Sequence, residues 1–319
     1  MSAATVRAGR TGRRTTSAVL ALVAVTAVWG STFPLSKDLL TRLPVTDYLA
    51  LRFLTAAAVI GLTRPGALRR IDGRVLLVGA GLGSCYAAGQ ALQFFGLPHT
   101  PATVSAFVVS MYVVVTPLLA ALLLRVRPSG PALLATALAS AGVGVMSLRG
   151  WTLGFGEALT LAAAAFYALH ILALSRWSTG RTAYPLTFVQ LLTIGLCLLA
   201  WAARDGVQVP GRHDIAGFLY LSVVAGACAL LVQTWAQSHV PAAPAAVVMV
   251  LEPVWAAFFG LVIWREPLDG RTAVGGALVV CATWLVVVMS RRAARAAASG
   301  AADAAGVGAV PPRQGDDGS

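Results

Sequence analysis

The sequence predicts an all-α integral membrane protein, with ten transmembrane helices arranged as two inverted five-helix repeats. Three observations support this fold: a hydrophobic content of 58% with only 11% charged residues, ten apolar stretches of spanning length, and an internal repeat. A soluble domain carries about 25% charged residues. This chain has too few charges to cover a solvent-facing surface of its size, and a lipid-facing surface remains.

The ten predicted spans are apolar stretches close to the length that crosses a bilayer, which is about 20 residues. They must be helical because a backbone in lipid has to satisfy its own hydrogen bonds. The first follows Arg13-Arg14 like a twin-arginine signal, but nine more spans follow, so we expect a retained helix. The spans are Ser17–Ser36, Asp47–Thr63, Val75–Phe95, Ala102–Leu124, Pro131–Leu148, Leu153–Ser175, Tyr184–Ala203, Ile215–Gln237, Ala243–Trp264 and Thr272–Met289.

The net charge of +12 indicates membrane orientation, because the basic residues sit singly or in pairs at the ends of apolar runs. A nucleic-acid partner is therefore not expected. With the N-terminus in the cytoplasm, fifteen basic residues near the spans fall inside: Arg7, Arg10, Arg13, Arg14, Arg64, Arg69, Arg70, Arg74, Arg125, Arg127, Arg176, Arg181, Arg291, Arg292 and Arg295. Seven fall outside: Lys37, Arg42, Arg149, Arg204, Arg212, Arg265 and Arg271. This bias predicts a multi-pass protein of the bacterial inner membrane with both termini cytoplasmic.

The chain divides into four predicted segments. Residues 1–16 form a cytoplasmic N-terminal segment, 17–150 the first repeat and 151–290 the second. Residues 291–319 are rich in Ala and Gly and form a disordered cytoplasmic tail. The four cysteines lie singly inside apolar runs, so neither a disulfide framework nor a zinc site is expected, and no cofactor is expected.

The internal repeat appears when the chain is shifted against itself by 138 and then 140 positions. Arg52 then falls on Gln190, Gln93 on Gln233, and Trp29 on Tyr167. Each half holds five spans, and because five is odd the second half enters the membrane from the opposite side. Inverted repeats are typical of alternating-access transporters. A duplicated structural membrane protein is the alternative.

Three motifs carry a family resemblance. They are Ala27-Val-Trp-Gly-Ser-Thr-Phe33, the pair Leu251-Glu-Pro-Val254 and Trp264-Arg-Glu-Pro-Leu268, and the Gly275-Gly276 span. Together they resemble the drug/metabolite transporter superfamily in its EamA-type branch. The resemblance implies ten helices around a central cavity and movement of small metabolites, often export of amino acids or their derivatives. One departure is Leu124-Arg-Val-Arg-Pro128, which lacks the glutamate of the second copy.

Charged groups inside predicted spans are costly, which makes them candidate functional residues. Arg52 could bind a substrate carboxylate, pair with Asp47, or snorkel to the outer interface. Glu252, beside Pro253, could carry a proton, meet an ammonium group, or bond a neighbouring helix. His170 could couple protons, or it could be satisfied by a helix neighbour.

Amide and aromatic side chains are further candidates for a cavity or a gate. Gln90, Gln93, Gln190 and Gln233 could bind a zwitterion or lock helices together, and Gln93 with Gln233 could be gate groups at opposite ends. Trp29, Phe33, Tyr112, Phe166, Tyr167 and Trp235 could wall a cavity or face lipid. Gly30 and Pro34 flank Ser31 and Thr32, which predicts an interrupted first helix that exposes backbone groups to a cavity.

These patterns predict an alternating-access exporter of small metabolites such as amino acids or their derivatives. Its partners are a small-molecule substrate and the lipid bilayer, with a homo-oligomer left open. An integral-membrane enzyme is one alternative, but the chain shows no HExxH, no GxSxG and no acidic pair in one loop, so no enzymatic activity is expected. A non-transporting structural or sensory protein is the other alternative.

Overall fold

The computed structural model describes residues 3–123, 130–149, 152–204, 206–240, 251–263 and 268–282, with the single positions 245, 248, 249, 265, 284, 285 and 288. The predicted tail at 291–319 and the Leu124–Pro128 segment lie outside these residues. So do Trp264, Glu266 and Pro267 of the second-copy motif.

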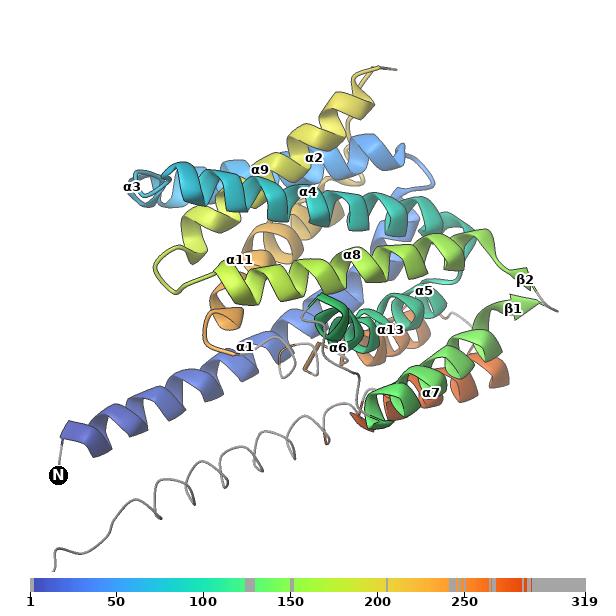
Figure 1. Ribbon diagram of the computed structural model, residues 1–319. Coiled ribbons are helices and arrows are strands. Elements are labelled where there is room, and N and C mark those ends of the chain that lie inside the picture. The colour runs from blue at the N-terminus through green and yellow to red at the C-terminus, as the bar shows by residue number, and fades with distance from the viewer. Residues whose placement is uncertain are drawn as a thin grey trace, which may run out of the picture.

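The first half of the chain consists, in its described part, of helices joined by short loops as far as Ser147. Its elements are α1 (Ala3–Leu39), α2 (Val45–Thr63), α3 (Pro65–Leu68), α4 (Gly73–Gly96), the 3-10 turn η1 (Leu97–His99), α5 (Ala102–Val109), α6 (Tyr112–Leu123) and α7 (Gly130–Ser147). Figure 1 shows α1 running out of the bundle toward the labelled N-terminus, so that the predicted N-terminal segment continues this helix from residue 3.

The second half repeats the pattern with one unusual helix. The strand β1 (Leu148–Arg149) ends the first half. The elements of the second half are β2 (Thr152–Leu153), α8 (Phe155–Trp177), α9 (Ala183–Ala202), α10 (Ile215–Leu219), the π-helix η2 (Tyr220–Cys228), α11 (Ala229–Gln237) and α13 (Leu251–Val262). A further apolar helix covers Gly270–Ala282.

The helices have the length and composition of a membrane protein. Seven in the described part are long and apolar enough to cross a bilayer. Three shorter apolar helices, Leu133–Val145, Leu251–Val262 and Gly270–Ala282, fall at the fifth, ninth and tenth predicted spans. The α-helical membrane class is therefore confirmed, and the count of ten spans stays a prediction.

One local prediction is wrong. The first helix is not interrupted, because α1 runs without a break through Pro34, and the Ser31 and Thr32 hydroxyls donate to the Val28 and Trp29 carbonyls, both at 2.7 Å. A short feature that was not predicted is the antiparallel ladder of β1 and β2, which pairs Leu148 with Leu153 between two helices. This ladder takes the end residues that the apolar pattern assigned to the fifth and sixth spans.

Pairs of helices that pack together in one arrangement have counterparts with the two halves exchanged. The α1–α13 contact has its counterpart in the contacts of α8 with α5 and α6, and the α4–α8 contact of Figure 1 has its counterpart in α1–α11. The α2–α9 contact joins equivalent helices of the two halves. Gly142 of α7 lies against the Gly275 carbonyl, where an added Cβ would come within 2.6 Å. Contacts therefore recur with the halves exchanged, as a duplicated chain should show.

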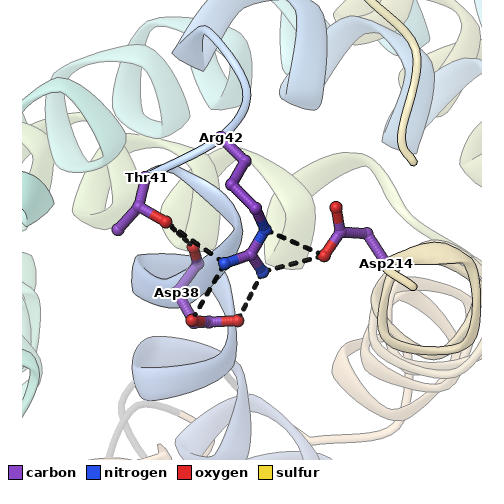
Figure 2. A network of polar contacts seen from close by, with 4 residues as sticks. All are labelled: Asp38, Thr41, Arg42 and Asp214. Atoms are coloured by element: carbon purple, nitrogen blue, oxygen red, sulfur yellow. Dashed lines mark hydrogen bonds and ion pairs between the residues drawn. The ribbon is translucent and has the colours of Figure 1, made fainter. Parts of the chain in front are cut away.

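The inter-helix loops gather at two ends of the bundle. We call the first the Arg42 end. There Arg42 of the α1–α2 loop binds Asp214 before α10 (Figure 2), and the backbone N–H of Gln208 donates to the Asp47 carboxylate at 2.8 Å. We call the second the Arg64 end, because Arg64 follows α2 there. At this end the Tyr184 hydroxyl of α9 donates to the Ile60 carbonyl of α2 at 2.6 Å. Loops predicted to share a side of the membrane thus share an end.

Candidate functional site

A buried cavity lies between the two halves. Helices of both halves line it, with polar and aromatic side chains predominating. The lining residues are Trp29, Thr32, Phe33, Arg52, Tyr86, Gln90, Gln93, Phe94, Val109, Tyr112, Tyr167, His170, Ile171, Gln233, Met249 and Glu252. A cation, a carboxyl group and three glutamines buried together among apolar spans are costly, which makes this cavity the candidate functional site.

Arg52 of α2 supplies the cation of this cavity. Its side chain is buried, at 4% exposure. Its Nε donates to the Leu221 carbonyl at 3.0 Å, and its Nη1 donates to the Tyr48 hydroxyl at 3.3 Å. The guanidinium carbon also lies 5.3 Å from the centre of the Phe53 ring, a cation–π distance. These contacts hold the charge in place without neutralising it.

Two of the three interpretations of Arg52 are wrong. The side chain does not snorkel, because it is buried. It does not pair with Asp47, whose carboxylate instead accepts hydrogen bonds from Thr46 and from the Gln208 amide. Both ion pairs within the described residues belong to Arg42. Arg52 is therefore a buried cation with no carboxylate partner in this part of the chain.

Glu252 of α13 supplies the carboxyl group. It is 8% exposed, and its Oε2 accepts a hydrogen bond from the Tyr112 hydroxyl at 3.3 Å. Gly30 lets α1 approach this position, since an added Cβ there would lie 2.9 Å from the Glu252 carbonyl and 2.5 Å from Trp255 Cβ. The close α1–α13 packing therefore positions Glu252 at the cavity.

Three glutamines line the cavity, and two of them have unused acceptors. Gln90 donates to the Tyr167 hydroxyl at 2.7 Å, and that hydroxyl donates to Gln93 Oε1 at 2.5 Å. Among the described residues, the buried Oε1 atoms of Gln90 and Gln233 have no hydrogen-bond partner. An unpaired buried acceptor is costly, so both atoms are available to donors of a ligand. Gln93 and Gln233, predicted as gate groups at opposite ends, line one cavity.

The π-helix η2 was not predicted, and it contacts this site twice. Its Leu221 carbonyl accepts from Arg52, and its Ala225 carbonyl accepts from Trp29 Nε1 at 3.0 Å. A π-helix replaces i→i+4 hydrogen bonds by i→i+5 bonds and occurs frequently at functional sites. The segment Tyr220–Cys228 contains no proline and no charged residue, so its sequence carries no signal for the change of helix type.

The remaining predicted residues divide between the cavity and its surroundings. His170 lines the cavity, and its Nε2 lies 2.8 Å from Gln190 Oε1, so the histidine is satisfied by a neighbouring helix. Gln190 and Ser31 do not line it, although Ser31 bonds the Tyr220 hydroxyl at 2.7 Å. Phe166 and Trp235 are also absent from the lining.

Sequence reasoning missed Tyr86, Phe94, Val109, Ile171 and Met249, which complete the lining. Tyr86 could have been found, because it lies four residues before Gln90 and so shares its face of α4. The others are apolar residues within apolar spans, and no sequence feature separates them from lipid-facing neighbours. No group of three metal-ligating side chains occurs in the described parts of the chain.

Comparison with known proteins agrees with this architecture. The EamA-like transporter family matches residues 16–148 and again residues 154–288. An uncharacterized transporter of Archaeoglobus fulgidus is 28% identical over 291 residues, which cover 89% of each chain. One solved crystal structure aligns with a TM-score of 0.64 at 20% identity, over 87% of this chain and 98% of the other, which shows a shared fold. Because the family matches both halves and most of the chain, this protein belongs to the EamA-like transporter family, a branch of the drug/metabolite transporters, and is a multi-pass membrane transporter.

Proposed function

We propose that this protein exports small metabolites that carry both an ammonium group and a carboxylate, such as amino acids or their derivatives. The observation that carries the proposal is that a buried guanidinium and a buried carboxyl group line one cavity. Arg52 and Glu252 line the same space, and neither has an ion-pair partner among the described residues. Burying an unpaired charge costs several kcal/mol, and a zwitterionic ligand would offset that cost at both ends.

The other lining groups suit such a ligand. The free Oε1 atoms of Gln90 and Gln233 can accept hydrogen bonds from an ammonium group. Trp29, Phe33, Tyr86 and Tyr167 offer apolar surface to a side chain or a carbon skeleton. A site of this composition recognises charge and hydrogen-bonding pattern first, and tolerates variation in the apolar part of its ligand.

Alternating access is supported by the arrangement of the halves around the cavity. Helices of both halves supply the lining, and the packing contacts recur with the halves exchanged. We take the ten spans to form two inverted repeats in the bacterial inner membrane, with both termini cytoplasmic. The arginine excess at the Arg64 end supports this orientation. The direction of transport rests on the family resemblance.

Transport by oriented vesicles tests the proposal. Inside-out vesicles that contain the protein should take up radiolabelled amino acids, and right-side-out vesicles should not accumulate them. Two analogues of each transported compound, its amide and its N-acetyl derivative, remove the carboxylate or the ammonium charge. Because the site is built for both groups, each analogue should lose at least ~100-fold in transport efficiency.

Each outcome bears on a separate part of the proposal. Absence of uptake across a broad panel of amino acids and derivatives would end the claim that these are substrates. Equal transport of a parent compound and its amide would remove Arg52 from carboxylate binding. Uptake only by right-side-out vesicles would reverse the direction.

A further inference from the structure

A second hollow lies at the Arg64 end, separate from the central cavity. The segment that follows α2 and the segment that enters α9 form it together, so one wall comes from each half. Its walls include Arg64, Gly66, Arg70, Gly180, Arg181 and Tyr184. None of these residues lines the central cavity.

The charge of this hollow is positive and unbalanced. Arg64, Arg70 and Arg181 are exposed, and none of the described residues that line the hollow is acidic. In the described part of the chain, none of the three forms an ion pair. The nearby Asp72 is engaged elsewhere, because it caps α4 by accepting from the Val75 amide at 2.7 Å. Three like charges around one concave surface create a field that attracts an anion.

The wall beneath these arginines is firmly held. The Tyr184 hydroxyl donates to the Ile60 carbonyl and lies 2.7 Å from Thr63 Oγ1, which ties α9 to the end of α2. The guanidinium carbon of Arg64 lies 5.7 Å from the centre of the Tyr184 ring. The hollow is thus built on two packed spans. The positive-inside tendency accounts for arginines at this end of the bundle, but not for their convergence around one concave surface.

Large apolar side chains are exposed close in sequence to these arginines, at the ends of the spans α2 and α8. Leu62, two residues before Arg64, is 81% exposed, and Trp177, four residues before Arg181, is 48% exposed. Side chains of this kind at the end of a span belong to the boundary between headgroups and acyl chains. An anion that binds here would carry an apolar part that follows these side chains.

We propose that this hollow binds the phosphate group of an anionic phospholipid of the surrounding leaflet. Arginine pairs well with phosphate because its planar guanidinium can donate two parallel hydrogen bonds. Basic pockets between spans on the cytoplasmic side are a recognised place for such headgroups. Because each half supplies one wall, the bound lipid would bridge the two halves at this end. The inference does not depend on the identity of the transported substrate.

Native mass spectrometry of the purified full-length protein tests this proposal. The protein is titrated with phosphatidylglycerol or with phosphatidylcholine of the same acyl chains. Wild type should retain the anionic lipid preferentially. The triple variant Arg64→Gln, Arg70→Gln, Arg181→Gln should lose about a hundredfold in its affinity for phosphatidylglycerol, since each arginine near a membrane surface contributes about fivefold. Its affinity for phosphatidylcholine should change little.

A matched control removes the same number of charges elsewhere. Arg204, Arg212 and Arg265 are exposed and fall on the predicted outer side, so their triple glutamine variant should bind phosphatidylglycerol like wild type. Equal losses in both triple variants would show general surface charge and overturn the proposal, as would equal retention of the two lipids by wild type. Inorganic phosphate distinguishes a soluble ligand: if it displaces the lipid at equal concentration, the hollow is a site for free phosphate and the lipid assignment is wrong.

Discussion

Arg42 and Arg52 lie ten residues apart and have opposite surroundings. Arg42 is at the Arg42 end with 44% of its side chain exposed, and it bonds Asp38 Oδ2 at 2.6 Å and Asp214 Oδ1 at 2.8 Å (Figure 2). These hydrogen bonds raise the pKa of the Arg42 guanidinium. Arg52 is 4% exposed and has carbonyl, hydroxyl and ring neighbours but no carboxylate among the described residues.

The difference separates an exposed arginine that joins two loops, Arg42, from a buried arginine whose charge is unpaired among the described residues, Arg52. Exposed ion pairs contribute little to stability because solvent and salt screen them, so the Arg42 network joins two loops without being essential. A buried cation without a counterion is expensive, and Arg52 is held by contacts that leave its charge uncancelled. The contrast predicts that the two arginines respond very differently to the same substitution.

The largest effect is expected for Arg52→Gln. Glutamine retains a hydrogen-bond donor and loses the charge, so a substrate carboxylate would be left without its partner. Breaking a buried pair costs ~3–5 kcal/mol, which corresponds to a loss in transport efficiency above about a hundredfold. Initial rates in proteoliposomes measure this, with size-exclusion profiles to show that the variant is folded. Transport within threefold of wild type would contradict the role of Arg52.

Glu252→Gln should follow, with a loss of about ten- to a hundredfold for zwitterionic substrates. The amide preserves the shape of the side chain and can still accept from Tyr112, so the effect isolates the charge. If Glu252 also carries a coupling proton, the pH profile of transport should flatten in this variant. Rates measured from mildly acidic to mildly basic pH test this, and an unchanged profile would remove Glu252 from proton coupling.

Tyr167→Phe tests the neutral side of the same cavity. Removal of the hydroxyl leaves the Gln90 amide without an acceptor and Gln93 Oε1 without a donor. Unpaired buried groups cost ~1–3 kcal/mol, so the two amides should turn toward other partners, lose their orientation at the cavity, and lower substrate affinity by about tenfold. Thermal-shift titration with a transported substrate measures this. Trp235→Phe, at an aromatic residue outside the cavity, serves as the matched control and should leave affinity unchanged.

The smallest effect is expected for Arg42→Gln. Transport should change by less than about twofold, because the lost ion pairs are exposed. Any difference from wild type should shrink as salt is raised, since salt screens surface charges. Initial rates at low and high ionic strength measure both. A loss comparable to that of Arg52→Gln would break the comparison and make the Arg42 network essential to the transport cycle.

The sequence predicted the membrane class because the length of an apolar stretch can be read locally. It predicted the two halves from the internal repeat. It also identified Trp29, Thr32, Arg52, Gln90, Gln93, Tyr112, Tyr167, His170, Gln233 and Glu252, which the structure brings to one cavity. Polar groups inside apolar spans are conspicuous in a single sequence, and most of them face the interior for the same energetic reason. Their roles in transport remain predictions.

Features that depend on the packing of a neighbouring helix could not be predicted from the sequence. Gln190 matches Arg52 in the repeat, yet it lies behind the cavity because His170 comes between, a relation fixed only by packing. Gly30 and Pro34 indicated a broken helix, but the Ser31 and Thr32 hydroxyls bond within the helix and α1 continues. Phe94 lines the cavity, whereas Phe95 packs against Trp201 with ring centroids 5.2 Å apart, so one step of helical rotation separates the two environments.

The π-helix has a consequence for how the site responds to a ligand. The Leu221 carbonyl of η2 accepts from Arg52, and the Ala225 carbonyl accepts from Trp29. Because Leu221 lies within the π-helix, its carbonyl also accepts the i→i+5 backbone bond of that helix. A substrate carboxylate that draws the Arg52 Nε away would therefore free α2 from η2 without leaving an unsatisfied carbonyl in the bilayer. Arg52 would act as a releasable link between the two halves.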